Sequence, residues 1–171
     1  KVIIPDDFFG KVIARHENTA QIHATNKPLD IVVDDLPETK KLYFDDYLLT
    51  ENLAKVLSIQ PIFHEMEVET AEDVGVMKKF RAWAVILDQS IAYPTSGVQL
   101  HDTGTIDKVQ FVDVIKVNHV IVHILSESPP FYVNDEVVVK IDKKRRKLLT
   151  QHHSATHIVN AAARQVLGNH V

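Results

Sequence analysis

The chain has 171 residues, of which 45% are hydrophobic and 25% are charged, as expected for one or two ordinary globular domains. It contains no cysteine, which excludes disulfides, a cysteine nucleophile and a zinc site completed by its own thiolates. Its formal net charge is −4, so any contact with nucleic acid must come from a local basic patch. No apolar run reaches the roughly 20 residues that cross a bilayer, and no signal peptide is visible. Because the sequence begins at Lys1 and ends just after a helix stop signal, we expect a fragment of a longer cytoplasmic protein.

The N-terminal part predicts a helical segment followed by a linker. Apolar residues within 8–13 recur on one face of a helix, and Asp6 and Asp7 lie in its first turn, where negative charge is favourable. Pro37 pushes the residue before it out of the helical region and so marks a turn. We therefore place a soft domain boundary at about residues 40–50.

The sequence between this linker and Ile141 has the pattern of β-strands. Asn118 suits a tight hairpin turn between two of them. Five or six strands in about 90 residues, with no helical period between them, favour a small barrel or a sandwich. The apolar and alternating runs that predict strands are residues 53–59, 80–87, 105–116, 119–125 and 136–141.

After Ile141 the apolar period changes to 3.6 residues, which predicts a long C-terminal helix. Asp142 is suited to cap its first turn, apolar residues keep one face as far as Leu167, and Gly168 is a stop signal. The sequence therefore predicts an α+β fold. In it, a small β-barrel is flanked by an N-terminal helical segment and by this long helix.

Two histidines in the C-terminal helix, His153 and His157, are the strongest chemical feature. They are four residues apart, a spacing that lets two imidazoles hold one Zn²⁺ at about 2.0–2.1 Å. No glutamate lies between them as in H-E-x-x-H, so the general base of a metalloprotease is missing. His152 is about 100° away around the helix and is interpreted as a neighbour rather than a ligand. On spacing alone, two partly buried helix histidines that bind no metal are the more common case.

A loop rich in proline, serine and glycine, within residues 87–106, connects two predicted strands. Its small residues allow the backbone to approach a ligand closely. Gln99, His101 and Asp102 can supply hydrogen bonds from this loop. An ordinary connection between strands is the alternative.

A basic run, made of Lys140 and residues 143–147, lies at the start of the C-terminal helix. Positive charge is disfavoured there by about 0.3–1 kcal/mol per residue, which suggests an anionic partner such as phosphate. Lys144, Arg145 and Arg146 are the candidate phosphate contacts, and a solvated helix face is the alternative. His119 and His123 are interpreted as packing or surface histidines.

Three segments together resemble the editing domain of alanyl-tRNA synthetases. His153-Ser154-Ala155-Thr156-His157, with the residues that follow to Gly168, is similar to its first zinc motif. The loop from Leu87-Asp88-Gln89-Ser90 through Tyr93-Pro94-Thr95-Ser96-Gly97-Val98-Gln99 to His101-Asp102-Thr103-Gly104-Thr105-Ile106 resembles the Gly-rich loop of the same domain. Residues 4–9, 16–17, 36–39 and 42–43 are similar to the stretch that precedes the barrel in archaeal-type members.

The resemblance implies a division into the end of a tRNA-recognition region (1–50), a barrel like those of translation factors (51–141) and the first helix of a zinc-binding editing core (142–171). It implies that the parent enzyme attaches alanine to tRNA(Ala), with ATP and Mg²⁺ bound outside this chain. The editing region would hydrolyse mischarged Ser-tRNA(Ala) and Gly-tRNA(Ala), and the isolated chain would be nearly inactive.

The resemblance also implies roles for individual residues. His153 and His157 would be two zinc ligands, and a Cys and a His from a downstream segment would complete the site. Gln99 would be the catalytic contact to the substrate. Val98 departs from the family pattern, in which a second glycine usually precedes the glutamine.

Two alternatives stay open at this stage. The first is a free-standing editing hydrolase related to the same domain, which the first 50 residues disfavour because such a protein would start near the barrel. The second is a non-enzymatic β-barrel module that binds RNA and whose histidines are structural.

Overall fold

The structure is a computed structural model that describes residues 31–46, 48–68, 76–95 and 99–168. The predicted helix near residues 8–13 and the departure at Val98 lie outside the described residues. In the part of the chain that is described, no helix is long and apolar enough to span a membrane.

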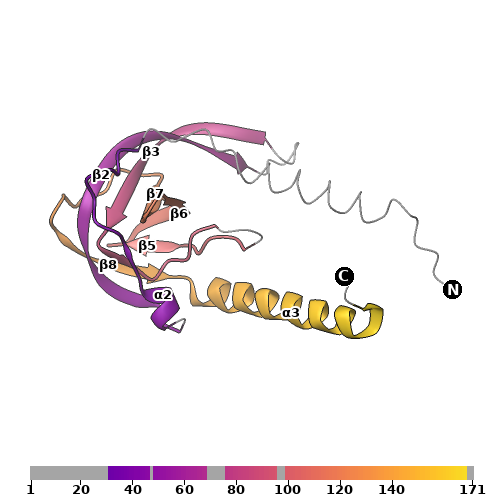
Figure 1. Ribbon diagram of the computed structural model, residues 1–171. Coiled ribbons are helices and arrows are strands. Elements are labelled where there is room, and N and C mark those ends of the chain that lie inside the picture. The colour runs from indigo at the N-terminus through magenta and orange to yellow at the C-terminus, as the bar shows by residue number, and fades with distance from the viewer. Residues whose placement is uncertain (1–30, 47, 69–75, 96–98, 169–171) are drawn as a thin grey trace.

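Six strands close into an antiparallel barrel, in the order β2-β3-β7-β6-β5-β8 (Figure 1). The prediction of an α+β fold is confirmed for the described residues, and the sheet is a closed barrel rather than a sandwich. Two short strands pair in parallel beside it, and a single helical turn, α2, lies between the first of them and the barrel. The bounds are β1 Lys40–Lys41, α2 Leu42–Asp45, β2 Glu51–Val68, β3 Val76–Leu87, β4 Gln89–Ser90, β5 Gly104–Ile106, β6 Val109–Val117, β7 Val120–Leu125 and β8 Glu136–Ile141.

The end of strand β3, residues 84–87, is buried on both faces, which explains its continuous apolar run. Val85 and Leu87 belong to a cluster that takes residues from every strand of the barrel, so this cluster fills the barrel interior. Ala84 and Ile86 alternate with them and belong to a second cluster on the outer face. Residues 31–33 supply the cover for that outer face through Ile31 and Val33.

The prediction of one strand over residues 105–116 is wrong. Asp107 and Lys108 have φ angles of 45° and 74° and form a two-residue turn that separates β5 from β6. Two successive positive φ angles give the turn whose twist suits a hairpin, but the pair lacks the glycine that usually signals it. The hairpin turn at Asn118 is confirmed, with a φ of 52° between β6 and β7.

Gly104 is needed where β5 lies against β8. A Cβ atom at this position would be 2.0 Å from the Lys140 carbonyl oxygen and 2.8 Å from Cα of Ile141. Only glycine lets the two backbones approach this closely.

The helix α3, Lys143–Leu167, leaves the end of β8 and projects from the barrel (Figure 1). The predicted cap is confirmed, because Asp142 Oδ1 accepts hydrogen bonds from the backbone amides of Lys144 (2.8 Å) and Arg145 (3.2 Å). The predicted stop is also confirmed, since Gly168 has a φ of 94° and its amide donates to the Arg164 carbonyl. Arg146 is the buried residue of this helix.

Candidate functional site

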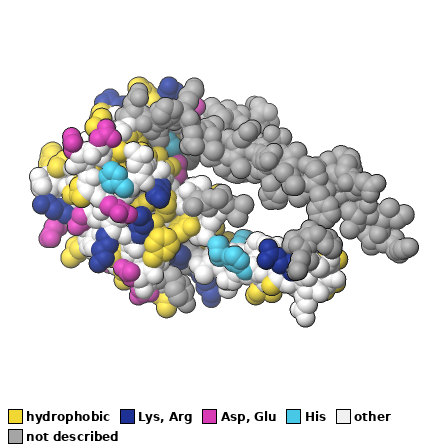
Figure 2. All heavy atoms as spheres, viewed as in Figure 1, with side chains coloured by type: hydrophobic (Ala, Val, Ile, Leu, Met, Phe, Trp, Pro, Cys, Tyr) yellow, Lys and Arg dark blue, Asp and Glu magenta, His cyan; other side chains and the backbone are white. Residues whose placement is uncertain are grey.

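His153 and His157 face each other across one turn of α3. Their Nε2 atoms are 2.9 Å apart, and their ring centroids are 4.6 Å apart at an interplanar angle of 64°. One Nε2 must donate and the other accept, because each neutral imidazole has one donor and one acceptor nitrogen. Both residues are exposed, and Figure 2 shows histidine side chains at the surface over α3. The pair is therefore convergent and open to solvent rather than partly buried.

The pair fits half of a zinc site. Two nitrogens bound to one tetrahedral Zn²⁺ at about 2.0–2.1 Å are about 3.3 Å apart, so the rings need to open by a few tenths of an ångström. Within the described ranges, no cluster of three or more His, Cys, Asp or Glu side chains could hold a metal ion. Further ligands would have to come from other residues.

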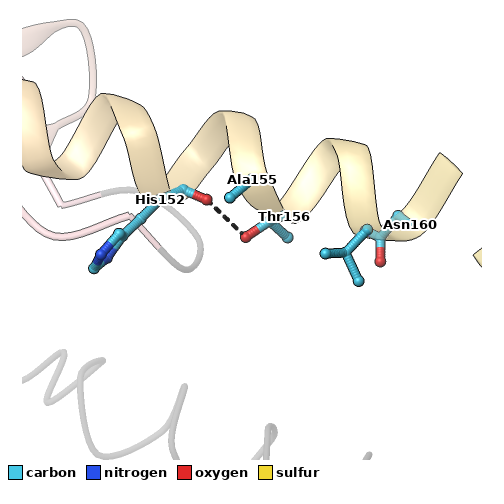
Figure 3. Close-up of a pocket in the computed structure, with 5 residues that line it drawn as sticks. His152, Ala155, Thr156 and Asn160 are labelled. Carbon is cyan, nitrogen blue, oxygen red and sulfur yellow. Dashed lines mark hydrogen bonds between the residues drawn. The ribbon is translucent and has the colours of Figure 1, made fainter. Parts of the chain in front are cut away.

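His152 lies on a different face of the helix. It lines an open hollow together with Ala155, Thr156, Val159 and Asn160. Its carbonyl accepts a hydrogen bond of 2.9 Å from the Thr156 hydroxyl (Figure 3). Helix geometry puts this side chain about 100° away from His153, and its interpretation as a neighbour stays a prediction.

The loop between β4 and β5 is closed at its neck by Tyr93 and Asp102. The Asp102 amide donates to the Tyr93 carbonyl at 3.0 Å, and the Tyr93 amide donates to Asp102 Oδ2 at 2.7 Å. Gln99 lies within the loop so formed and is half-buried. Thr95 also ties the outgoing limb to the barrel, by donating its amide to the Val114 carbonyl at 3.0 Å.

Arg146 contacts the neck of this loop. Its Nε lies 3.1 Å from each carboxylate oxygen of Asp102, and its Nη2 lies 2.6 Å from Oδ2. The same Nη2 donates to the Ile91 carbonyl at 2.6 Å. Arg146 is 8% exposed and Asp102 is 1% exposed, so the guanidinium is occupied inside the fold and does not present itself to an external phosphate.

The other two candidate phosphate contacts differ in their surroundings. Lys144 is exposed, whereas Arg145 is half-buried and its Nε donates to the His101 carbonyl at 3.0 Å. Figure 2 shows acidic and basic side chains interspersed over the visible face of the barrel. Any basic surface at the start of α3 is therefore a small patch, as expected for a chain whose net charge is negative.

A cluster that sequence reasoning missed joins His64, His101 and Asp113. His64 Nε2 is 3.2 Å from Asp113 Oδ2, and His101 Nε2 is 3.6 Å from Asp113 Oδ1. His101 Nδ1 lies 2.8 Å from the Asp102 carbonyl, which can only accept, so this nitrogen carries the hydrogen. The three residues are far apart in sequence, and a β-bulge near Val112 sets the register of Asp113, so no local pattern signals the cluster.

A second missed pair is His123 with Ser90. Ser90 Oγ and His123 Nε2 are 2.9 Å apart, and both residues are 0% exposed. Burial lowers the pKa of His123 from its ordinary value of 6.5 to about 4, against the opposing effect of its hydrogen bond to the Val85 carbonyl. A serine–histidine pair with no access to substrate is structural, as the packing interpretation of His123 expects. His119 lies in the hairpin turn, where its Nε2 is 2.7 Å from the Leu36 carbonyl.

These observations define a class of protein: a closed β-barrel module with a projecting helix that presents two convergent imidazoles and is tied at its first turn to a loop by a buried ion pair. The chain belongs to the family described as tRNA synthetases class II (A), whose sequence model matches residues 3–145.

The chain is similar to alanine–tRNA ligases along nearly its whole length. It is 36% identical over 170 residues to that of Methanocella arvoryzae, covering 99% of this chain and 17% of the relative. It is 36% identical over 181 residues to that of Sulfurisphaera tokodaii, covering 100% of this chain and 18% of the relative. For the Natronomonas pharaonis protein the identity is 40% over 177 residues, covering 99% and 17%. The chain thus spans less than a fifth of the length of these relatives.

Proposed function

We propose that this chain is the editing region of an alanine–tRNA ligase and hydrolyses Ser-tRNA(Ala) and Gly-tRNA(Ala) as part of the intact enzyme. The parent would attach alanine to tRNA(Ala) in the cytoplasm, with ATP and Mg²⁺ bound outside this chain. The observation that carries the proposal is the convergent, exposed pair His153 and His157 in a chain similar to these ligases over 99% of its length.

The chemistry gives such an enzyme a reason to edit. A pocket shaped for alanine cannot exclude glycine by size, because the smaller amino acid always fits. Serine adds only a hydroxyl group, which an apolar pocket rejects weakly. A second, hydrolytic site that removes both errors is the general solution to this problem.

We assign three parts to the chain: residues 1–50 as the end of a tRNA-recognition region, 51–141 as a barrel of the translation-factor type, and 142–171 as the first helix of the editing core. The similarity to the ligases extends through the first part, which favours this assignment over a free-standing hydrolase.

We assign His153 and His157 as two ligands of Zn²⁺, completed by two ligands from outside this chain. Zinc bound there would supply a Lewis acid and an activated water for ester hydrolysis. Gln99 contacts the substrate from the loop, and Lys144 and Arg145 contact tRNA phosphates. Arg146 leaves this last group because Asp102 occupies its guanidinium.

The test uses the full-length parent enzyme that contains this chain. We expect His153→Ala to remove one zinc per protein and to lower the rate of Ser-tRNA(Ala) hydrolysis by at least a hundredfold, since a zinc site that loses one of its imidazoles no longer positions water. Alanylation of tRNA(Ala) should be unchanged.

His152→Ala is the matched control, because it removes an adjacent exposed imidazole that is about 100° away from His153 around the helix. Hydrolysis that survives His153→Ala would contradict the proposal. A parent that binds tRNA(Ala) but never hydrolyses Ser-tRNA(Ala) would favour the non-enzymatic RNA-binding module.

A further inference from the structure

We infer that the buried ion pair between Arg146 and Asp102 is a positioning device. It fixes the distance and the rotation of α3 relative to the loop that carries Gln99, and so aims the histidine pair at that loop. The orientation of α3 by this ion pair is inferred from the structure alone, whereas its effect on catalysis rests on the proposed function.

The first observation is that Arg146 contacts both limbs of the loop at its neck. Its guanidinium binds Asp102 on the returning limb and the Ile91 carbonyl on the outgoing limb. Asp102 in turn holds the Tyr93 amide. One side chain of α3 therefore closes the base of the loop in which Gln99 lies.

The second observation is the phase of the helix. An α-helix turns by about 100° per residue, so His153 and His157, seven and eleven residues beyond Arg146, lie within about 20° of its direction. The face that meets the loop at Arg146 is thus the face that carries the imidazoles, about 10 Å further along the axis for His153 and about 16 Å for His157. The arginine sets which way the pair points.

The third observation is that the helix has few other anchors. Arg146 is its buried residue, and every described residue from Gln151 to Ala162 is exposed. The remaining contacts to the loop are at the same end. The Asp142 amide donates to the Thr103 carbonyl at 2.8 Å, and Arg145 Nε donates to the His101 carbonyl. Over the exposed stretch that carries the histidines, the direction of α3 therefore follows from its first turn.

An ion pair suits this task better than an apolar contact of the same size. A buried ion pair adds little net stability over apolar packing. Its forked hydrogen bonds, however, are directional, because the planar guanidinium meets the carboxylate in one orientation. Apolar packing would hold the helix against the barrel but would allow it to rotate.

The first experiment measures the geometry directly in the 171-residue chain. Because the chain has no cysteine, Leu100→Cys and Ala155→Cys, both at exposed positions, can carry two nitroxide labels without side reactions. Double electron–electron resonance should give one narrow distance distribution. Arg146→Met should broaden it at least twofold, while Lys147→Met, which removes the same charge from an exposed neighbour, should leave it unchanged.

A second variant guards against misfolding. Arg146→Met leaves Asp102 as an unpaired buried carboxylate, whereas the double variant Arg146→Met with Asp102→Asn removes both charges. The double variant should keep the circular dichroism spectrum of the barrel and still show the broad distribution. An unchanged distribution in either folded variant would overturn the inference. Loss of the barrel in both would also overturn it, in favour of a purely structural ion pair.

The catalytic consequence is tested in the intact parent enzyme. Arg146→Met should lower kcat for Ser-tRNA(Ala) hydrolysis by about ten- to a hundredfold, the cost of misplacing a catalytic group by about 1 Å, with KM within twofold. Arg146→Lys should recover part of the loss, because it restores the charge without the fork. A rise in KM with an unchanged kcat would contradict the positioning role. A wild-type parent without hydrolysis, together with label distances that respond as expected, would overturn the proposed function and leave the geometric inference standing.

Discussion

His123 shows how one buried side chain couples the barrel to pH. Its Nδ1 lies 3.3 Å from the Val85 carbonyl and therefore carries the hydrogen. Its Nε2 accepts from the Ser90 hydroxyl, whose oxygen in turn accepts from the Ala92 amide at 3.0 Å. The neutral ring is fully satisfied, and a second proton would place a charge in the barrel interior next to Phe111.

We predict that the chain loses stability as the pH falls below 6.5. The unfolded chain binds a proton at His123 near pH 6.5, whereas the folded chain does so only near pH 4. Between these values the unfolded state holds more protons, so the free energy of unfolding falls with a slope that approaches about 1.4 kcal/mol per pH unit, which amounts to about 1.5 kcal/mol from pH 6.5 to 5. Urea unfolding at pH 7.5, 6.5 and 5 measures this loss.

His123→Gln is the control for this prediction. It removes the titrating ring, so the variant should be less stable at pH 7.5 but should lose less stability on acidification. An equal loss between pH 6.5 and 5 in both proteins would assign the pH dependence to other groups.

The cap of α3 makes a prediction at the scale of one element. Asp142 accepts from two backbone amides that have no other helical partner, and it lies before five consecutive basic residues. Asp142→Ala should cost about 1 kcal/mol, which corresponds to a fall in Tm of about 2–4 °C for a domain of this size. Thermal unfolding followed by circular dichroism measures the change.

Asp142→Asn separates the two causes of that effect. Asparagine keeps the capping oxygen but removes the charge that favours the helix N-terminus. A Tm close to the wild-type value assigns the stability to the hydrogen bonds, and a Tm close to that of Asp142→Ala assigns it to charge. Equal Tm values for Asp142→Ala and the wild type would show that the cap contributes nothing.

The elements that the sequence predicted are those with strong local signals. The apolar run at 80–87 and the capped, 3.6-periodic helix after Asp142 both appear where their patterns are unmistakable. The turn at Asp107 and Lys108 was missed because lysine is not a usual carrier of positive φ and no glycine follows Asp107. Its support comes from Val138 on β8, which exchanges two hydrogen bonds with Asp107. That contact exists only once the barrel is closed.

At the scale of the whole molecule, the site also combines features that follow from local sequence spacing with features that depend on the closed barrel. His153 and His157 meet within one helical turn, so their convergence follows from spacing alone. Arg146 and Asp102 are 44 residues apart, and the sequence pattern placed Arg146 in a solvated or phosphate-binding run. Its burial depends on where β8 ends against the loop, which is a property of the closed barrel. A run of charged residues therefore predicts a solvent-exposed segment only on average, and a single member of the run can be buried.

The basic start of α3 gives the last prediction, which concerns how the molecule meets RNA. Lys144 is exposed and lies on the turn that the barrel anchors to the loop, so a phosphate held there would lie at a fixed distance from Gln99. Lys144→Gln should weaken binding of tRNA(Ala) and should lower the slope of log affinity against log salt concentration by about 1, because one fewer counterion is released.

Lys116→Gln removes an equally exposed charge from β6. Lys116 is five residues beyond Phe111, the residue that pairs with Gly104, and is therefore about 17 Å further from the helix start, so this variant should leave both quantities unchanged. Equal salt slopes for the wild type and Lys144→Gln would return this residue to a solvated helix face, and equal effects of the two variants would indicate attraction by net charge rather than a phosphate contact at this turn.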